Sequence, residues 1–191
     1  MSHFEFIFSL YSLLLGLSLV ELISGLGRTL KARLQGSDEG LEAFRIGWLT
    51  PLLGLFVMLD LLSFWGAAWA VRDLITVTGT TLMGVMLFAS CYYLAAHLVF
   101  PDVVPADGDL DRHYFRVRRV VISVLFFLLF VQLAYYAATP ELAPRLVQPL
   151  PLILTAILVI LMALTMFVRS TMANIIVLAL LIARYALVYI L

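Results

Sequence analysis

Residues 152–191, LILTAILVILMALTMFVRSTMANIIVLALLIARYALVYIL, form one nearly continuous apolar stretch of forty residues. As a single α-helix this stretch would be about 60 Å long, which is about twice the thickness of the hydrocarbon core of a membrane. The segment is therefore expected to fold back and cross a membrane twice. No glycine or proline marks the turn, and we place it at residues 169–171, where the charge of Arg169 reaches water.

The whole chain has the same apolar character. Of its 191 residues, 64% are hydrophobic and 13% are charged, and the mean hydropathy is +1.09. Soluble domains contain about 25% charged residues, and helices that are apolar on all sides are typical of membrane spans. We therefore predict an all-α integral membrane protein, a single-domain bundle of six transmembrane helices with the lipid bilayer as its surroundings.

The six spans follow from the alternation of apolar and polar segments. They are expected at about residues 4–26, 46–69, 74–100, 120–138, 152–168 and 172–191. The first segment has neither a basic region before it nor a small-residue cleavage site after it, so we expect it to be kept as a span.

Basic residues are distributed unevenly between the predicted loops. Nine of the twelve Lys and Arg residues fall in the first, third and fifth loops, whereas Arg72 and Arg145 fall on the other side and Arg184 lies within a span. Cytoplasmic loops are enriched in Lys and Arg. This asymmetry predicts that both termini lie outside, in the periplasm if the host is a Gram-negative bacterium. Trp48 and Trp69, about 31 Å apart on a helix, would mark the two headgroup levels of the second span.

Several functional classes find no support in the sequence. The formal net charge of zero gives no electrostatic basis for nucleic-acid binding. Cys91 is the single cysteine, so no intrachain disulfide forms. No catalytic, metal-binding or cofactor-binding motif is present, so we assign no catalytic residue, metal or cofactor, and an intramembrane enzyme ranks third among the possible functions.

One loop partly resembles a calcium site. Asp107, Asp109 and Asp111 alternate as the first three ligands of an EF-hand do, but Arg112 stands where that loop needs glycine and Arg118 where it needs glutamate. We therefore predict a helix that begins at Asp111 with an acidic first turn. The arginines at 116, 118 and 119 are expected to anchor it at anionic headgroups.

Three polar residues are predicted at one depth near the middle of the membrane. Counted from the cytoplasmic edge of their spans, Asp60, Gln132 and Arg184 lie 14, 12 and 13 residues in. Because a charge in the bilayer needs a partner or water, we predict that Asp60 pairs with Arg184 and that Gln132 serves either one. This layer would be an ion or proton site or a static salt bridge. Alternatively, Arg184 extends to the headgroups and leaves Asp60 alone.

A second polar level is predicted nearer the cytoplasm. It contains Glu21, Thr50, His97 and Asn174. A glutamate and a histidine at one depth can exchange protons near neutral pH, although groups within two turns of a span's edge are often simply interfacial.

Small residues in the first span predict close helix packing. Ser9, Ser12, Gly16 and Gly27 clear one side of that helix for another backbone. The partner would be a helix of the same chain, a second copy in a homo-oligomer, or another membrane protein.

The sequence resembles a group of small bacterial multi-spanning membrane proteins to which no activity is attached. The resemblance lies in FSLYSLLLGLSLVELISGLGRTLKAR (residues 8–33), FWGAAW (64–69), YYLAAHLVFPD (92–102) and DRHYFRVRR (111–119). It implies a bacterial inner-membrane location. Two functions are considered first. One is a small ion or solute transporter or channel subunit, which the predicted polar layer favours. The other is an accessory or scaffold protein that packs against a larger membrane partner.

Overall fold

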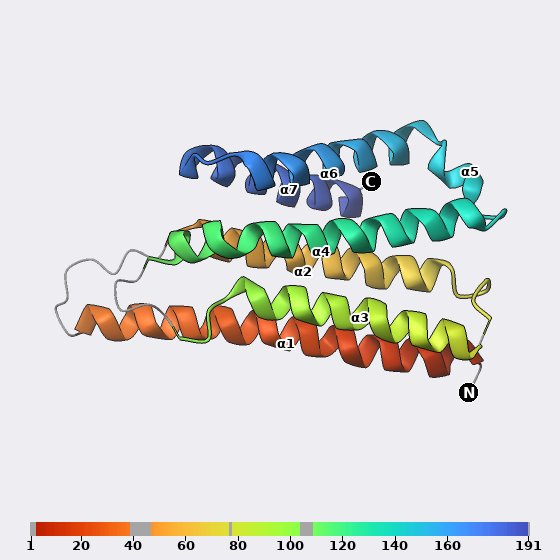
Figure 1. Ribbon diagram of the computed structural model, residues 1–191, viewed down its shortest axis with the longest axis horizontal. Coiled ribbons are helices and arrows are strands. Elements are labelled where there is room, and N and C mark those ends of the chain that lie inside the picture. The colour runs from red at the N-terminus through yellow and green to blue at the C-terminus, as the bar shows by residue number, and fades with distance from the viewer. Residues whose placement is uncertain (1–2, 39–46, 77, 104–108, 191) are drawn as a thin grey trace.

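The computed structural model describes residues 3–38, 47–76, 78–103 and 109–190, and this part of the chain is helical without a strand (Figure 1). The helices are α1 (His3–Asp38), α2 (Leu49–Ala70), α3 (Gly79–Val99), α4 (Leu110–Ala138), α5 (Ala143–Leu146), α6 (Pro149–Phe167) and α7 (Thr171–Ile190). All except the short α5 are long and apolar enough to cross a membrane. The predicted all-α membrane fold with six such helices is confirmed.

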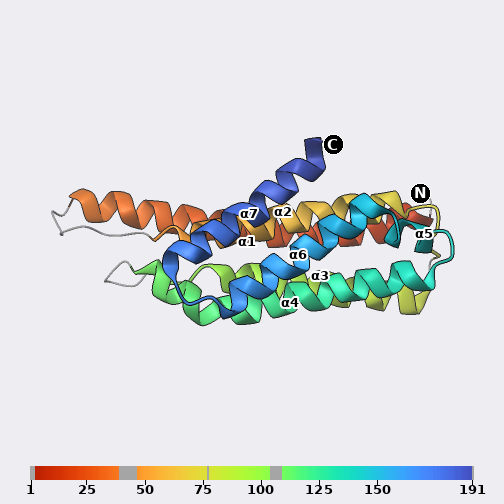
Figure 2. The same ribbon diagram turned by 90° about the horizontal axis from the view of Figure 1, so that it is seen from above.

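The long helices form three layers of two. Helices α1 and α3 make one layer, α2 and α4 the middle one, and α6 and α7 the third (Figure 1). Figure 2 shows α6 and α7 crossing the other helices obliquely. The helix termini next to the first, third and fifth connections lie together at one end of the bundle (Figure 1). We call this the inner end, after the predicted orientation. Residues 71–76 and α5 lie at the outer end.

Three helix boundaries differ from the predicted spans. Helix α1 continues through the polar stretch to Asp38, because residues 28–34 lack proline and glycine and, apart from Thr29, are good helix formers. Helix α4 begins at Leu110, where the Asp109 side chain accepts a hydrogen bond from the Arg112 N–H. The connection before α3 runs to Thr78, whose hydroxyl caps the Thr81 N–H. It is therefore longer than the break predicted at Arg72 and Asp73.

The start of α2 is capped by α4 and not by its own residues. The Asp111 carboxylate accepts a hydrogen bond from the Leu49 N–H at 3.2 Å, and the Thr50 hydroxyl donates to the Leu110 carbonyl at 2.8 Å. Gly47 leaves the space for Asp111, since a Cβ atom there would meet its carboxylate at 1.8 Å. These contacts hold the inner ends of α2 and α4 side by side.

The turn between α6 and α7 lies where the sequence predicts it. Helix α6 ends at Phe167 and α7 begins at Thr171. The Asn174 side chain donates to the carbonyls of Val168 and Ser170, so it satisfies acceptors that the turn would otherwise leave unpaired.

Candidate functional site

Asp60 is buried near the middle of α2, with 2% of its surface exposed. Its two carboxylate oxygens accept hydrogen bonds from the hydroxyls of Tyr92 on α3 and Tyr185 on α7. Among the described residues, no Lys, Arg or His side chain lies within ion-pair distance of the Asp60 carboxylate. A carboxyl group inside the membrane is thus held by two neutral donors from the two neighbouring layers.

The predicted pair between Asp60 and Arg184 is not formed. The Arg184 Nε donates instead to the Leu154 carbonyl on α6 at 3.3 Å, and its guanidinium lies 4.7 Å from the centre of the Tyr185 ring. Arg184 and Tyr185 are consecutive, so their side chains leave α7 about 100° apart and only one of them can face Asp60. Gln132 lies on α4 and faces a cavity, with no bond to either residue. A functional role for the three residues stays a prediction.

The four residues of the second predicted level lie at three different places in the structure. Glu21 and His97 are brought together, with 3.2 Å between the carboxylate and Nδ1, and Arg28 lies 3.6 Å from the same carboxylate. Thr50 binds the start of α4, as described above, and Asn174 belongs to the turn before α7. The Glu21–His97 pair joins α1 to α3 at a partly exposed position near the inner end.

Arg118 is buried, with 3% of its surface exposed, whereas the sequence predicted it at the headgroups. It donates to the Thr165 carbonyl at 2.8 Å, to the Val168 carbonyl, and to the Asn174 side-chain oxygen at 2.9 Å. Tyr114 donates to the same Asn174 oxygen. The carbonyls at a helix C-terminus lack intrahelical partners and carry partial negative charge. The guanidinium of Arg118 therefore caps α6, which fixes α6 and α7 against α4.

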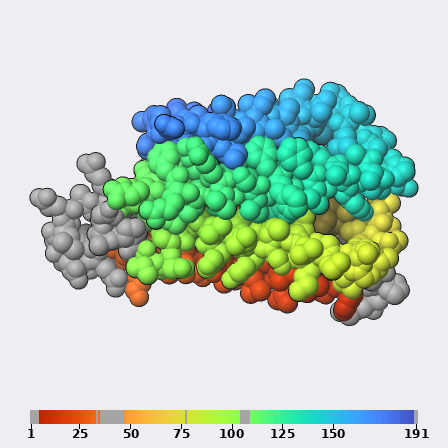
Figure 3. Space-filling view, viewed as in Figure 1, coloured from red at the N-terminus to blue at the C-terminus, as the bar shows by residue number. Residues whose placement is uncertain are grey.

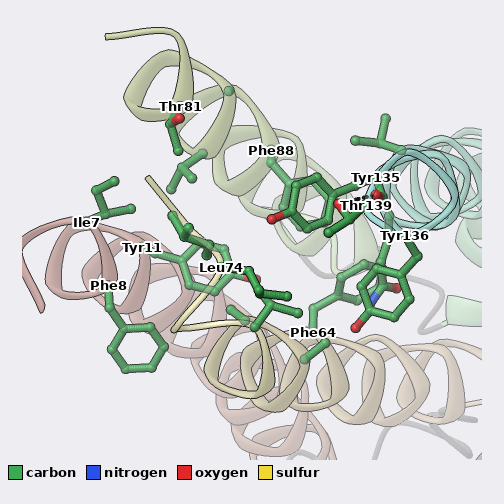
Figure 4. A pocket seen from close by; sticks show the side chains of 18 of the residues that line it. Ile7, Phe8, Tyr11, Phe64, Leu74, Thr81, Phe88, Tyr135, Tyr136 and Thr139 are labelled. Atoms are coloured by element: carbon green, nitrogen blue, oxygen red, sulfur yellow. Dashed lines mark hydrogen bonds between the residues drawn. The ribbon is translucent and has the colours of Figure 1, made fainter. Parts of the chain in front are cut away.

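A cavity of about 620 Å³ opens between α1, α2, α3 and α4 at the outer end. Figure 4 shows Tyr11, Phe64 and Phe88 reaching into it from three helices, with Tyr135 and Tyr136 of α4 nearby. Threonines at 76, 80, 81 and 139 line it near the helix ends, and none of the described side chains that line it is charged. The deep part of the cavity is therefore mainly apolar, and the part near the outer end is lined by threonine hydroxyls.

The floor of the cavity is packed directly on the partner of Asp60. The rings of Phe64 and Phe88 lie 5.3 and 6.0 Å from the Tyr92 ring, and the hydroxyl of Tyr92 binds Asp60. Tyr11 contacts Phe88 at 6.4 Å. One aromatic layer thus separates the cavity from the buried carboxylate.

Sequence reasoning missed the tyrosines around Asp60. The residues predicted for the polar layer include no tyrosine, whereas Tyr92 and Tyr185 lie within their spans and are 0% and 1% exposed. The available signal was their distance from the span ends, since a tyrosine hydroxyl deep in a span needs a partner.

Within the described ranges no three His, Cys, Asp or Glu side chains gather as metal ligands would. No protein-family model, no curated protein and no solved structure matches the chain.

Proposed function

We propose that the protein is a small membrane transporter in which Asp60 carries a proton. The observation that supports this is the position of Asp60, a buried carboxyl group with only hydroxyl donors, one aromatic layer below a cavity open at the outer end. Ionisable groups within membranes commonly mark ion and proton pathways. A hydroxyl that donates to a carboxylate oxygen can also relay a proton to or from it.

The Glu21–His97 pair supports access from the other side. His97 follows Tyr92 by five residues on α3, about 7.5 Å along the helix axis. Histidine changes charge near neutral pH, and this one contacts a carboxylate at the predicted cytoplasmic edge. The described residues thus place titratable groups at two depths, Asp60 near the middle of the bundle and the Glu21–His97 pair nearer the inner end.

Proton movement into proteoliposomes loaded with a pH-sensitive dye tests the proposal. An imposed membrane potential is expected to drive proton uptake by the wild-type protein, and Asp60→Asn is expected to reduce the rate about tenfold or more, to that of empty liposomes. Asp73→Asn is the matched control, because Asp73 lies in the outer connection with 85% of its side chain exposed.

Equal rates for wild type and Asp60→Asn, with both proteins monodisperse and equally helical, would contradict the proposal. So would a wild-type rate equal to that of empty liposomes.

The accessory or scaffold function remains the second candidate. The face of α1 that points away from the other helices favours it. A Cβ atom at Gly16 or Gly27 would meet nothing within 4 Å, so these small residues do not pack within the described bundle. They offer a close approach to a helix of a second copy or of another membrane protein. Gly16→Leu is then expected to dissociate an oligomer or a copurifying partner in mild detergent, and unchanged particle mass would contradict this function.

We also propose that the membrane is a bacterial inner membrane with both termini in the periplasm. Support comes from the nine basic residues that the sequence analysis assigns to the first, third and fifth loops, and from the resemblance to small bacterial multi-spanning proteins.

A further inference from the structure

The polar groups of the outer cavity include two that have no hydrogen-bond partner among the described residues. Tyr11 is 6% exposed, and its hydroxyl makes no hydrogen bond with any described residue. The side-chain amide of Gln132, half-buried on α4, is likewise unbonded among the described residues. The hydroxyl and the amide are accessible from the cavity, so both are free to hydrogen-bond a molecule bound in it. These two groups line one cavity from α1 and α4, so a single ligand can satisfy both.

The lining determines the charge of such a ligand. The described side chains around the cavity offer hydroxyls, one amide and many apolar surfaces, but no cation or anion. A charged ligand would lose its hydration without gaining an ionic partner. An uncharged molecule with a hydroxyl or carbonyl group keeps its hydrogen bonds at Tyr11 and Gln132.

The size and position of the cavity determine the ligand's shape and source. A volume of about 620 Å³ is within the range of small-molecule sites. On α2 the lining extends from Phe64 to Val71, about 10 Å along the axis, or about a third of the hydrocarbon core. Figure 3 shows a hollow between α3 and α4 toward this end of the bundle. A ligand can therefore enter sideways from the lipid.

We infer that the outer cavity binds an uncharged long-chain amphiphile, with a hydroxyl or carbonyl group, taken from the outer leaflet. Its oxygen is held by Tyr11 and Gln132, the first part of its chain lies against Phe64 and Phe88, and the rest of the chain extends into the lipid between α3 and α4. The assignment rests on the proposed transport function, because it makes this amphiphile the transported solute.

Photolabelling tests the site in lipid nanodiscs that contain the full chain. The probe is a long-chain alcohol with a diazirine in its chain, and the competitor is plain hexadecanol. Excess hexadecanol is expected to reduce labelling of the cavity residues about fivefold or more, while labelling of lipid-facing residues persists.

A matched pair of glycine variants separates the cavity from the general lipid surface. Gly84 lines the cavity and Gly66 does not, and a Cβ atom at either meets nothing within 4 Å. Gly84→Phe is expected to abolish the competed labelling by filling the cavity, and Gly66→Phe to leave it unchanged. Equal competed labelling in the two variants would overturn the site.

The polar contacts and the ligand class have their own tests. Tyr11→Phe and Gln132→Leu are each expected to raise the hexadecanol concentration needed for competition about fivefold, the value of one neutral hydrogen bond. Palmitate is expected to compete about tenfold more weakly than hexadecanol, because its carboxylate finds no cation. Equal competition by palmitate would overturn the uncharged class.

Asp60→Asn distinguishes this inference from the proposed function. The variant is expected to keep competed labelling and to lose proton flux. Competed labelling with undiminished flux would contradict only the transport function, whereas lost flux without competed labelling in any variant would contradict only the amphiphile site.

Discussion

The Tyr185 hydroxyl on α7 donates a hydrogen bond to Oδ1 of Asp60 on α2, across 125 positions of sequence. Helices α2 and α7 contact each other in the bundle, and this bond joins the middle layer to the third layer. The Tyr92 hydroxyl makes the corresponding bond from the α3 side. Asp60 therefore links three helices that have little else polar between them.

Tyr185→Phe is expected to lower the free energy of unfolding by about 1 kcal/mol, because it leaves one oxygen of a buried carboxyl group without its donor. Denaturation in mixed micelles followed by circular dichroism measures the change. Tyr189→Phe is the matched control, since Tyr189 lies one turn further on the same helix and is 52% exposed. Equal stability of the two variants would show that the Asp60 bond contributes nothing.

Arg118→Ala is expected to lower the free energy of unfolding by about 3 kcal/mol, because it removes charge-assisted hydrogen bonds to the end of α6 and to Asn174 of α7. Arg116→Ala, an exposed position two residues earlier, is expected to change stability by less than about 0.5 kcal/mol. The same denaturation measurement compares them. A small effect at Arg118 would mean that water replaces its contacts.

Gly25→Ala and Gly27→Ala are expected to change stability in opposite directions. A Cβ atom at Gly25 would lie 2.6 Å from the Phe100 ring, and overpacking of this kind costs about 1–3 kcal/mol. At Gly27 nothing lies within 4 Å, so alanine should stabilise the helix by up to about 1 kcal/mol. Thermal unfolding of both variants in one detergent checks the signs, and a stabilising Gly25→Ala would contradict the close contact of α1 with Phe100.

Thiol labelling is expected to place the α6–α7 turn and the α4–α5 connection on opposite sides of the membrane. In a Cys91→Ser background, Glu141→Cys should react with an impermeant reagent added to intact spheroplasts, and Ser170→Cys should react only after lysis. The reverse pattern would invert the proposed orientation, and labelling of both in intact spheroplasts would contradict the assignment of spans.

Much of the fold could be predicted from the sequence because hydropathy and segment length are properties of each segment by itself. The forty apolar residues at 152–191 require a turn, and the turn lies at the charge of Arg169 and the helix start at Thr171. Glu21 and His97 could be assigned to one level by counting residues from the span ends, and the structure joins them. Counting gives depth, which is a coordinate along each helix axis.

The sequence by itself thus determined the membrane environment, the six long helices and the common level of Glu21 and His97. Only the tertiary structure decided which groups meet, because neighbours at one depth depend on the order of the helices and on the rotation of each about its axis. The orientation of α7 about its own axis is the reason that Tyr185 faces Asp60 and that Arg184 faces Leu154. The burial of Arg118 arises in the same way, since the end of α6 lies against α4 and its unpaired carbonyls attract the guanidinium.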